Sequence, residues 1–239
     1  MTTVVWHDVE CGAYAADIPL WRSLAKLHGD PVLDVGAGTG RIALDLARRG
    51  HRVTALDRSP DLLAELTRRA HGLPITTVVA DARDFELPTR FALVLVPMQT
   101  IQLLGGAEGR SEFLRRAQRH LSGPDGVVAV AVTEMLELFD SDEGWTLPAP
   151  DMRELDGVVY SSQPIAVREE EDGFVLERVR EIVGRRGERT TARDVIRLDR
   201  LTAAGLEREA GAAGLRPAGR VSVEPTPDHV GSVVVMLGG

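Results

Sequence analysis

Apolar runs of strand length alternate with segments of helical period over the first 140 residues. The runs predict strands at 31–35, 51–57, 76–80, 91–96 and 127–133. The periodic segments predict helices at 41–49, from Pro60 onward, and at about 109–121. Strict alternation of strand and helix indicates a parallel sheet with helices on both faces. Right-handed crossovers then make the predicted α/β fold a doubly wound, mostly parallel sheet.

Residues that commonly begin and end helices support these boundaries. Ser59 is a good N-cap, and Pro60 follows it at the first helical position. Gly50 ends the helix at 41–49, as a residue just past a helix C-terminus commonly does. Thr202 and Gly214 bracket a further helix at 202–213 in the same way.

The pattern changes after about residue 140. Three extended segments, 158–168, 174–183 and 190–198, are joined by turn-like stretches and predict a small antiparallel β insertion. Segments 221–224 and 232–237 predict a closing antiparallel pair. No repeat or long linker divides the chain, so we predict a single domain over 1–239. It contains an N-terminal segment at 1–28 and the β insertion at 145–200.

Composition narrows the class of protein. The chain has 239 residues, of which 44% are apolar and 27% charged, as in globular proteins. Its formal net charge of -8 disfavours a nucleic-acid partner, because an acidic chain repels polyanions. The single cysteine, Cys11, fits a reducing compartment, and residues 1–10 lack the apolar core of a signal peptide. We therefore predict a cytoplasmic protein without a membrane segment.

The most informative stretch is VLDVGAGTGR at residues 32–41, where the first predicted strand passes into the first helix. Its three glycines let the backbone turn tightly and approach a ligand. Asp57 ends the second predicted strand, where a carboxylate can accept both hydroxyl groups of a ribose. This pattern predicts a nucleotide-type site at the carboxyl ends of the strands.

Two phosphate-binding patterns fail in this stretch. A dinucleotide fingerprint needs Gly or Ala where Arg41 stands, and a P-loop needs Lys-Ser or Lys-Thr, which the loop lacks. The histidines and Cys11 also lack metal-ligand spacing, so no metal site is predicted.

The segment DVGAGTG, Asp34 to Gly40, resembles motif I of class I (Rossmann-like) S-adenosylmethionine-dependent methyltransferases. The segment around Asp57 and Arg58 resembles their second motif, and that around Asp81 and Ala82 resembles the third. The resemblance covers about residues 30 to 135. It implies a seven-stranded sheet of order 3-2-1-4-5-7-6 with strand 7 antiparallel.

The resemblance also implies roles for individual residues. Gly36 and Gly38 would approach the methionyl part of S-adenosyl-L-methionine, and Asp34 would meet its amino group. Asp57 would bind the ribose, and Asp81 would bind the adenine. The implied cofactor-binding residues are Tyr14, Asp34, Gly36, Ala37, Gly38, Gly40, Asp57, Arg58, Asp81, Ala82, Pro97 and Met98.

The residues after the fourth predicted strand, VPMQ at 96–99, would lie beside the reactive methyl group. They differ from the [ND]-P-P-[YFW] motif of nucleic-acid and glutamine N-methyltransferases, which argues against those substrates. Gln99 and Glu134 are predicted to contact the acceptor. The segment at 1–28 would form a lid that brings Tyr14 near the cofactor's carboxylate, and His7 would serve as general base.

The sequence thus predicts a methyltransferase that moves a methyl group to an N or O atom of a small molecule by in-line displacement. S-adenosyl-L-homocysteine would be the product, and the β insertion would cover the substrate or form a homodimer contact. Two alternatives stay open: a non-catalytic cofactor-binding module, and an NAD(P)-dependent oxidoreductase, which Arg41 disfavours. The acceptor is left open.

Overall fold

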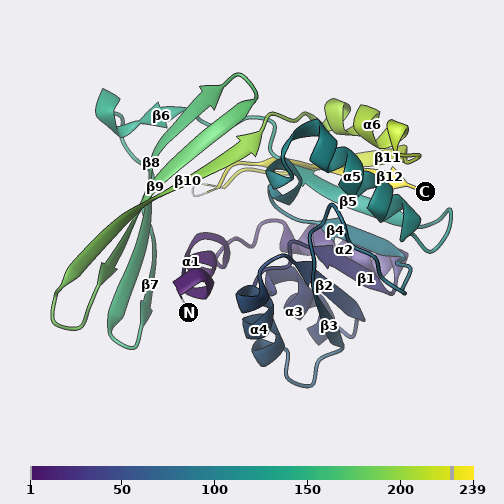
Figure 1. The fold of residues 1–239 in the computed structure, drawn as a ribbon, viewed down its shortest axis with the longest axis horizontal. Coiled ribbons are helices and arrows are strands. Elements are labelled where there is room, and N and C mark those ends of the chain that lie inside the picture. Colours follow the sequence, from purple (N-terminus) through teal and green to yellow (C-terminus); the bar gives the residue numbers. More distant parts are fainter. Residues whose placement is uncertain (1, 227–228) are drawn as a thin grey trace.

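The computed structural model describes residues 2–226 and 229–239, and two β-sheets dominate it (Figure 1). The larger sheet has seven strands in the order β11-β12-β5-β4-β1-β2-β3. Strands β1 to β5 are parallel, whereas β12 is antiparallel to both neighbours. This confirms the predicted order 3-2-1-4-5-7-6. The strands are β1 (Val32–Val35), β2 (Val53–Asp57), β3 (Ile75–Val79), β4 (Leu93–Val96), β5 (Val127–Val132), β11 (Arg216–Val223) and β12 (Ser232–Gly238).

Helices cover both faces of this sheet. Buried side chains of α2 (Ile18–His28), α3 (Arg41–Arg48) and α4 (Pro60–Arg69) pack on one face. Those of α5 (Gly106–Arg119) and α6 (Ala203–Ala212) pack on the other. Strand β4 shows why helices are needed on both faces of the sheet. All four of its side chains are buried, and they alternate between the two apolar cores.

The predicted caps of two helices are confirmed. The Ser59 side chain accepts a hydrogen bond from the Leu62 amide at the start of α4. The Thr202 side chain accepts one from the Gly205 amide at the start of α6, 3.0 Å away. Each hydroxyl satisfies an amide that the first turn of a helix leaves unpaired.

The smaller sheet is antiparallel and has five strands, in the order β10-β9-β8-β6 with β7 also pairing β8. Its long strands β8 (Val158–Glu170), β9 (Gly173–Val183) and β10 (Arg189–Asp199) confirm the three predicted segments. The short strands β6 (Phe139–Asp140) and β7 (Asp151–Leu155) were not predicted, because neither carries an apolar alternation. Two 3-10 turns complete the chain, η1 (Thr100–Leu103) and η2 (Ser141–Glu143).

The N-terminal segment contains a helix that sequence reasoning did not assign, α1 (Thr2–Cys11), ahead of α2. In Figure 1, α1 lies between the two sheets. Asp8 on this helix is paired with Arg69 of α4 and with Arg153 of β7, and it accepts a hydrogen bond from the Thr39 hydroxyl. One carboxylate therefore ties α1 to both sheets.

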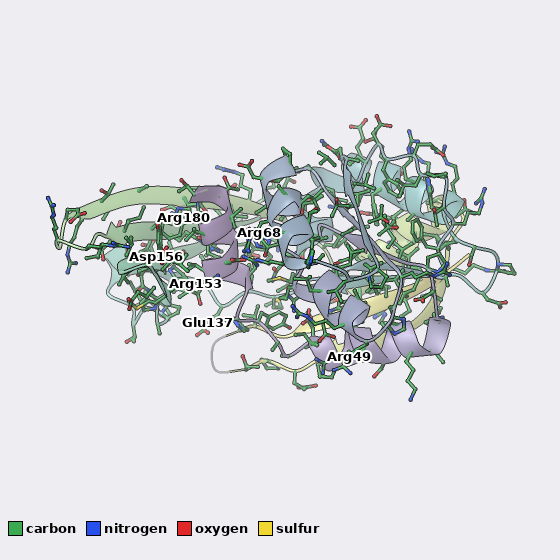
Figure 2. The ribbon with its side chains drawn as sticks, turned by 90° about the horizontal axis from the view of Figure 1, so that it is seen from below. Arg49, Arg68, Glu137, Arg153, Asp156 and Arg180 are labelled. Atoms are coloured by element: carbon green, nitrogen blue, oxygen red, sulfur yellow. The ribbon has the colours of Figure 1, made fainter. Side chains whose placement is uncertain are left out.

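A second carboxylate on α1 strengthens this attachment. Glu10 pairs with Arg180 at 2.7 Å and with Arg178 at 3.0 Å, both on β9, and accepts a hydrogen bond from Ser162 of β8. Figure 2 labels Arg153 and Arg180 where they lie beside α1. Among the described residues, no helix is both long and apolar enough to cross a bilayer.

Candidate functional site

A cavity of about 650 Å³ opens at the carboxyl ends of β1, β2 and β4, and the smaller sheet forms its far wall. This volume lies within the usual range of ligand pockets, roughly 300–1,000 Å³. Most of the residues singled out from the sequence line it. They are His7, Tyr14, Asp34, Gly36, Ala37, Asp57, Arg58, Asp81, Ala82, Pro97, Met98 and Gln99.

The loop between β1 and α3 has a backbone that only glycine accommodates. Gly36 has φ of +72°, and a Cβ there would lie 2.7 Å from the Thr100 side chain. Gly38 has φ of +54°, and a Cβ there would lie 2.1 Å from the His7 ring. Gly40 is the N-cap of α3, where an added Cβ would lie 2.2 Å from the Leu66 side chain. Gly36 therefore lines the cavity, whereas Gly38 and Gly40 lie outside its lining, Gly38 beneath the His7 ring and Gly40 against Leu66.

Asp34 is a buried carboxylate that faces the cavity without a partner. It is 1% exposed, and neither of its oxygens accepts a hydrogen bond of normal geometry from the described residues. Burial raises the pKa of this carboxyl to about 7. An unpaired buried carboxylate is costly, so the site is suited to a ligand that brings a cationic donor.

Asp57 organises the loop from the tip of β2. One of its oxygens accepts a hydrogen bond from the Gly38 amide at 2.9 Å, and the other accepts one from the Ser59 amide at 2.8 Å. A carboxylate has about four acceptor positions, so two amide bonds leave capacity for the hydroxyl groups of a ligand. The same side chain can thus hold the loop and bind a ribose.

Asp81 is already engaged by an arginine that sequence reasoning passed over. The Arg83 guanidinium makes two hydrogen bonds to it, at 2.9 and 2.7 Å, and the Arg83 amide adds a third. These bonds from Arg83 lower the pKa of Asp81 to about 2. The spacing Asp-x-Arg was the available signal. Asp81 keeps less acceptor capacity for an adenine than Asp57 keeps for a ribose.

Two residues of the N-terminal segment, His7 and Tyr14, line the cavity, and His7 covers part of the glycine loop. The His7 ring rests against Gly38, with its Nδ1 3.3 Å from the Thr39 hydroxyl. Burial lowers the pKa of His7, which keeps the imidazole neutral. Tyr14 is buried, with its ring edge-on to His229 and below the Arg41 guanidinium. Helix α1 therefore packs against the glycine loop through His7, and the role of the N-terminal segment as a lid stays a prediction.

Arg41 is a site residue that the sequence used only as a negative signal. Its side chain is 10% exposed, lines the cavity and makes a two-point ion pair with Asp17. It also donates to the Tyr14 carbonyl at 3.0 Å. Its place directly after Gly40 was the signal that could have identified it.

The tip of β4 carries backbone strain beside the cavity. Met98 has φ of +55°, a region that residues other than glycine seldom adopt and that is common at functional sites. Next to it, the Gln99 amide nitrogen donates to the Thr133 hydroxyl at 3.2 Å. No described residue donates to the Gln99 amide oxygen, which leaves that oxygen free to accept from a ligand.

The structure places Glu134 away from the cavity lining. Its carboxylate accepts a hydrogen bond from the Ala203 amide at 2.6 Å, at the first residue of α6. A carboxylate is favoured there because the amides of a helix N-terminus are unpaired and partly positive. Glu134 therefore lies outside the cavity lining, and its contact with the acceptor stays a prediction.

Comparison with known proteins agrees with this geometry. Residues 32–126 match the methyltransferase domain family. Over these residues the chain is similar to a methyltransferase domain. This stretch runs from β1 through β4 and holds the glycine loop, Asp57 and Asp81.

Curated relatives differ in what they act on. The chain is 31% identical over 118 residues to the probable cobalt-precorrin-6B C(15)-methyltransferase (decarboxylating) of Methanothermobacter thermautotrophicus, which covers 48% of this chain and 58% of that protein. It is 44% identical over 77 residues to the ribosomal RNA small subunit methyltransferase A of Anaeromyxobacter dehalogenans, which covers 32% and 27%. The chain thus matches only part of the length of each relative.

Solved structures extend the likeness to the whole fold. CalS10, an amino pentose methyltransferase from Micromonospora echinaspora solved with S-adenosylmethionine bound, superposes with a TM-score of 0.74. The match covers 98% of this chain and 97% of CalS10 at 19% sequence identity. The smaller sheet and the N-terminal helices therefore belong to a known variant of the fold.

Proposed function

We propose that the chain is an S-adenosyl-L-methionine-dependent methyltransferase that transfers a methyl group to an N or O atom of a small molecule. The observation that carries this proposal is the unpaired buried carboxylate of Asp34, at the rim of a cavity lined by Gly36 and Asp57. The cofactor has an α-ammonium group for Asp34 and ribose hydroxyls for Asp57. It has no phosphate, and the loop has no lysine to receive one.

The cofactor, when bound, supplies an activated methyl group, and the chain supplies orientation. Alignment of the two reactants can account for about 7–11 kcal/mol of a barrier. The Gln99 amide oxygen would accept a hydrogen bond from the acceptor, and α1, whose His7 packs against Gly38, would help to exclude water. The His7 imidazole is neutral and is therefore able to take a proton. Its ring packs against Gly38 of the glycine loop.

Two binding and turnover experiments test the proposal. S-adenosyl-L-homocysteine at about 100 times its dissociation constant should stabilise the protein by about 2.7 kcal/mol, and NADH should not. Methyl release from labelled cofactor should then occur with a metabolite panel. Binding without any turnover would leave a non-catalytic binding module, and selective binding of NADH would overturn the assignment.

The acceptor class and the cellular setting are part of the proposal. An acidic chain with a net charge of -8 favours a small acceptor over RNA, despite the ribosomal RNA relatives. One half-buried cysteine fits the reducing cytoplasm. A homodimer through the smaller sheet stays a prediction, which sedimentation would test.

A further inference from the structure

The smaller sheet gives the cavity a wall whose chemistry restricts the acceptor. Strand register sets three side chains opposite one another, because Leu176 of β9 pairs with Val167 of β8 and with Ile196 of β10. Directly opposed residues in a sheet point to the same face, and all three line the cavity. Leu198 of β10 and Phe139 of β6 extend this apolar wall.

The next row along the strands is polar but neutralised. Arg178 of β9 stands opposite Asp194 of β10, and its guanidinium pairs with Glu10 at 3.0 Å. Cys11 and Asp151 border the same end of the cavity. Arg178 shares Glu10 with Arg180, and the Arg180 guanidinium also pairs with Asp194, so two guanidiniums meet two carboxylates. This end of the cavity therefore carries no net positive charge, although the Nε of Arg178 has no partner among the described residues.

Two of the three other arginines that line the cavity are paired with carboxylates, whereas Arg58 makes no ion pair with the described residues. Arg41 pairs with Asp17, and Arg83 pairs with Asp81. Arg58 is exposed on the cofactor side, where its charge acts on Asp81. The chain has a single lysine, Lys26, which is exposed on α2 and outside the lining. Among the described lining residues, carboxylates outnumber guanidiniums, so the cavity disfavours a phosphate group.

We propose that the acceptor is a largely apolar molecule without phosphate, whose body packs on the row Val167, Leu176 and Ile196 while its N–H or O–H faces Gln99. This inference rests on the proposed function. It excludes acceptors that are activated as nucleoside diphosphates, because the cavity offers no excess positive charge to pair with their two phosphates.

A matched pair of probes tests the chemistry of the wall. 2-Phenylethylamine and 2-phenylethyl phosphate share an apolar body and differ in charge. Calorimetry on protein saturated with S-adenosyl-L-homocysteine should show the amine binding at least about tenfold more tightly than the phosphate. Equal or tighter binding of the phosphate overturns the proposal, and so does the absence of binding by the amine.

Substitutions of Leu176, at the centre of the apolar row, test whether this row binds the amine probe. Leu176→Ala should weaken amine binding about tenfold by removing apolar contact, and Leu176→Arg should reverse the preference between the two probes. Val195→Arg is the matched control, since Val195 is 49% exposed on the neighbouring strand and does not line the cavity. If Leu176→Arg does not fold, Leu176→Ala decides alone, and unchanged amine affinity in it contradicts the proposal.

Failure of the proposed function is distinguishable from failure of this inference. Saturation by S-adenosyl-L-homocysteine is measured first, and its absence counts against the proposed function. The two probes are then compared on the unloaded protein, where the same wall is present and the same preference is expected.

Discussion

The seven-stranded sheet buries both of its faces, whereas the five-stranded sheet turns one face to α1 and the cavity and exposes much of the other. Every residue of β5 is buried, but in β10 only Leu198 is. The first sheet is held by two continuous apolar cores. The second joins the first at α1, where a small apolar cluster around Trp6 is reinforced by the ion pairs of Asp8 and Glu10. It also joins it at the end of β10, where Asp199 pairs with Arg110.

The two sheets also differ in how their residues form the cavity. In the first sheet, a loop of a few consecutive residues forms the cofactor half of the cavity. In the second, the acceptor half is formed by residues on three strands, such as Val167 and Ile196, that meet only through strand register. Changes in the two regions should therefore affect different properties, and four substitutions test the division.

The largest effect is expected at the junction. Glu10→Ala leaves Arg178 and Arg180 without their carboxylate, and breaking such a buried pair costs roughly 3–5 kcal/mol of unfolding free energy. Burial opposes ionisation of Glu10, but the hydrogen bond from Arg180 and the charge of Arg178 hold its pKa below the usual 4.5. The stabilisation is therefore present above pH 4.5 and is lost as the pH falls through the lowered pKa.

Urea unfolding across pH 3 to 8 measures the effect of Glu10→Ala, with the exposed Glu171→Ala as control at about 0.5 kcal/mol or less. A Glu10 variant as stable as the control would show that the sheets do not depend on this junction.

The second-largest effect is expected for Asp34→Asn, which should stabilise the folded protein but weaken its binding of S-adenosyl-L-homocysteine. An unfolded Asp34 ionises near pH 3.8 and the folded one near 7, so the folded state loses stability as the pH rises between these values. Asp34→Asn should remove up to about 4 kcal/mol of this cost at pH 8 and change little at pH 4. It should also weaken S-adenosyl-L-homocysteine binding, because the ammonium loses its carboxylate.

Unfolding experiments and calorimetry on the same Asp34→Asn samples measure the change in stability and the change in affinity. In the unmodified chain, affinity for S-adenosyl-L-homocysteine should fall about tenfold per pH unit below pH 7, as Asp34 takes up a proton. Affinity that does not vary with pH would separate Asp34 from the ligand's ammonium.

Asp57→Ala removes the acceptor for the Gly38 amide and the proposed ribose contacts together. The loss of charge-assisted hydrogen bonds should weaken S-adenosyl-L-homocysteine binding about 100-fold, or roughly 3 kcal/mol. Asp45→Ala on α3, whose carboxylate pairs with Arg22, provides a control that should keep the affinity. An Asp57 variant with normal affinity would show that the ribose lies elsewhere.

Asp81→Ala should have the smallest effect, about tenfold or less on the same affinity, because Arg83 already occupies much of the carboxylate. Arg83→Gln tests the reason: it frees the carboxylate and should keep or improve binding. A larger loss in Asp81→Ala than in Asp57→Ala would reverse the ranking of the two contacts.

Sequence reasoning recovered the elements whose causes are local. The alternation of strands and helices, the caps Ser59 and Thr202, and the glycine loop all follow from neighbouring residues, and the structure confirms them. It missed β7 and α1, whose patterns are weak over short spans. It also did not show that Glu134, predicted to contact the acceptor, bonds the N-terminus of α6, because strand topology alone does not reveal which helix lies nearby.

The sequence by itself determined the alternating strands and helices of the parallel sheet and the carboxylates at the strand tips, because each depends on residues close together along the chain. The order of the strands was implied only by the resemblance to a known family. Only the tertiary structure decided that Asp34 lacks a hydrogen-bond partner among the described residues, that His7 covers Gly38 and that three strands supply one apolar row. These features depend on contacts between distant residues, such as Glu10 and Arg180, which are 170 positions apart. Local sequence patterns do not show which distant residues pair, because packing and strand register determine these contacts.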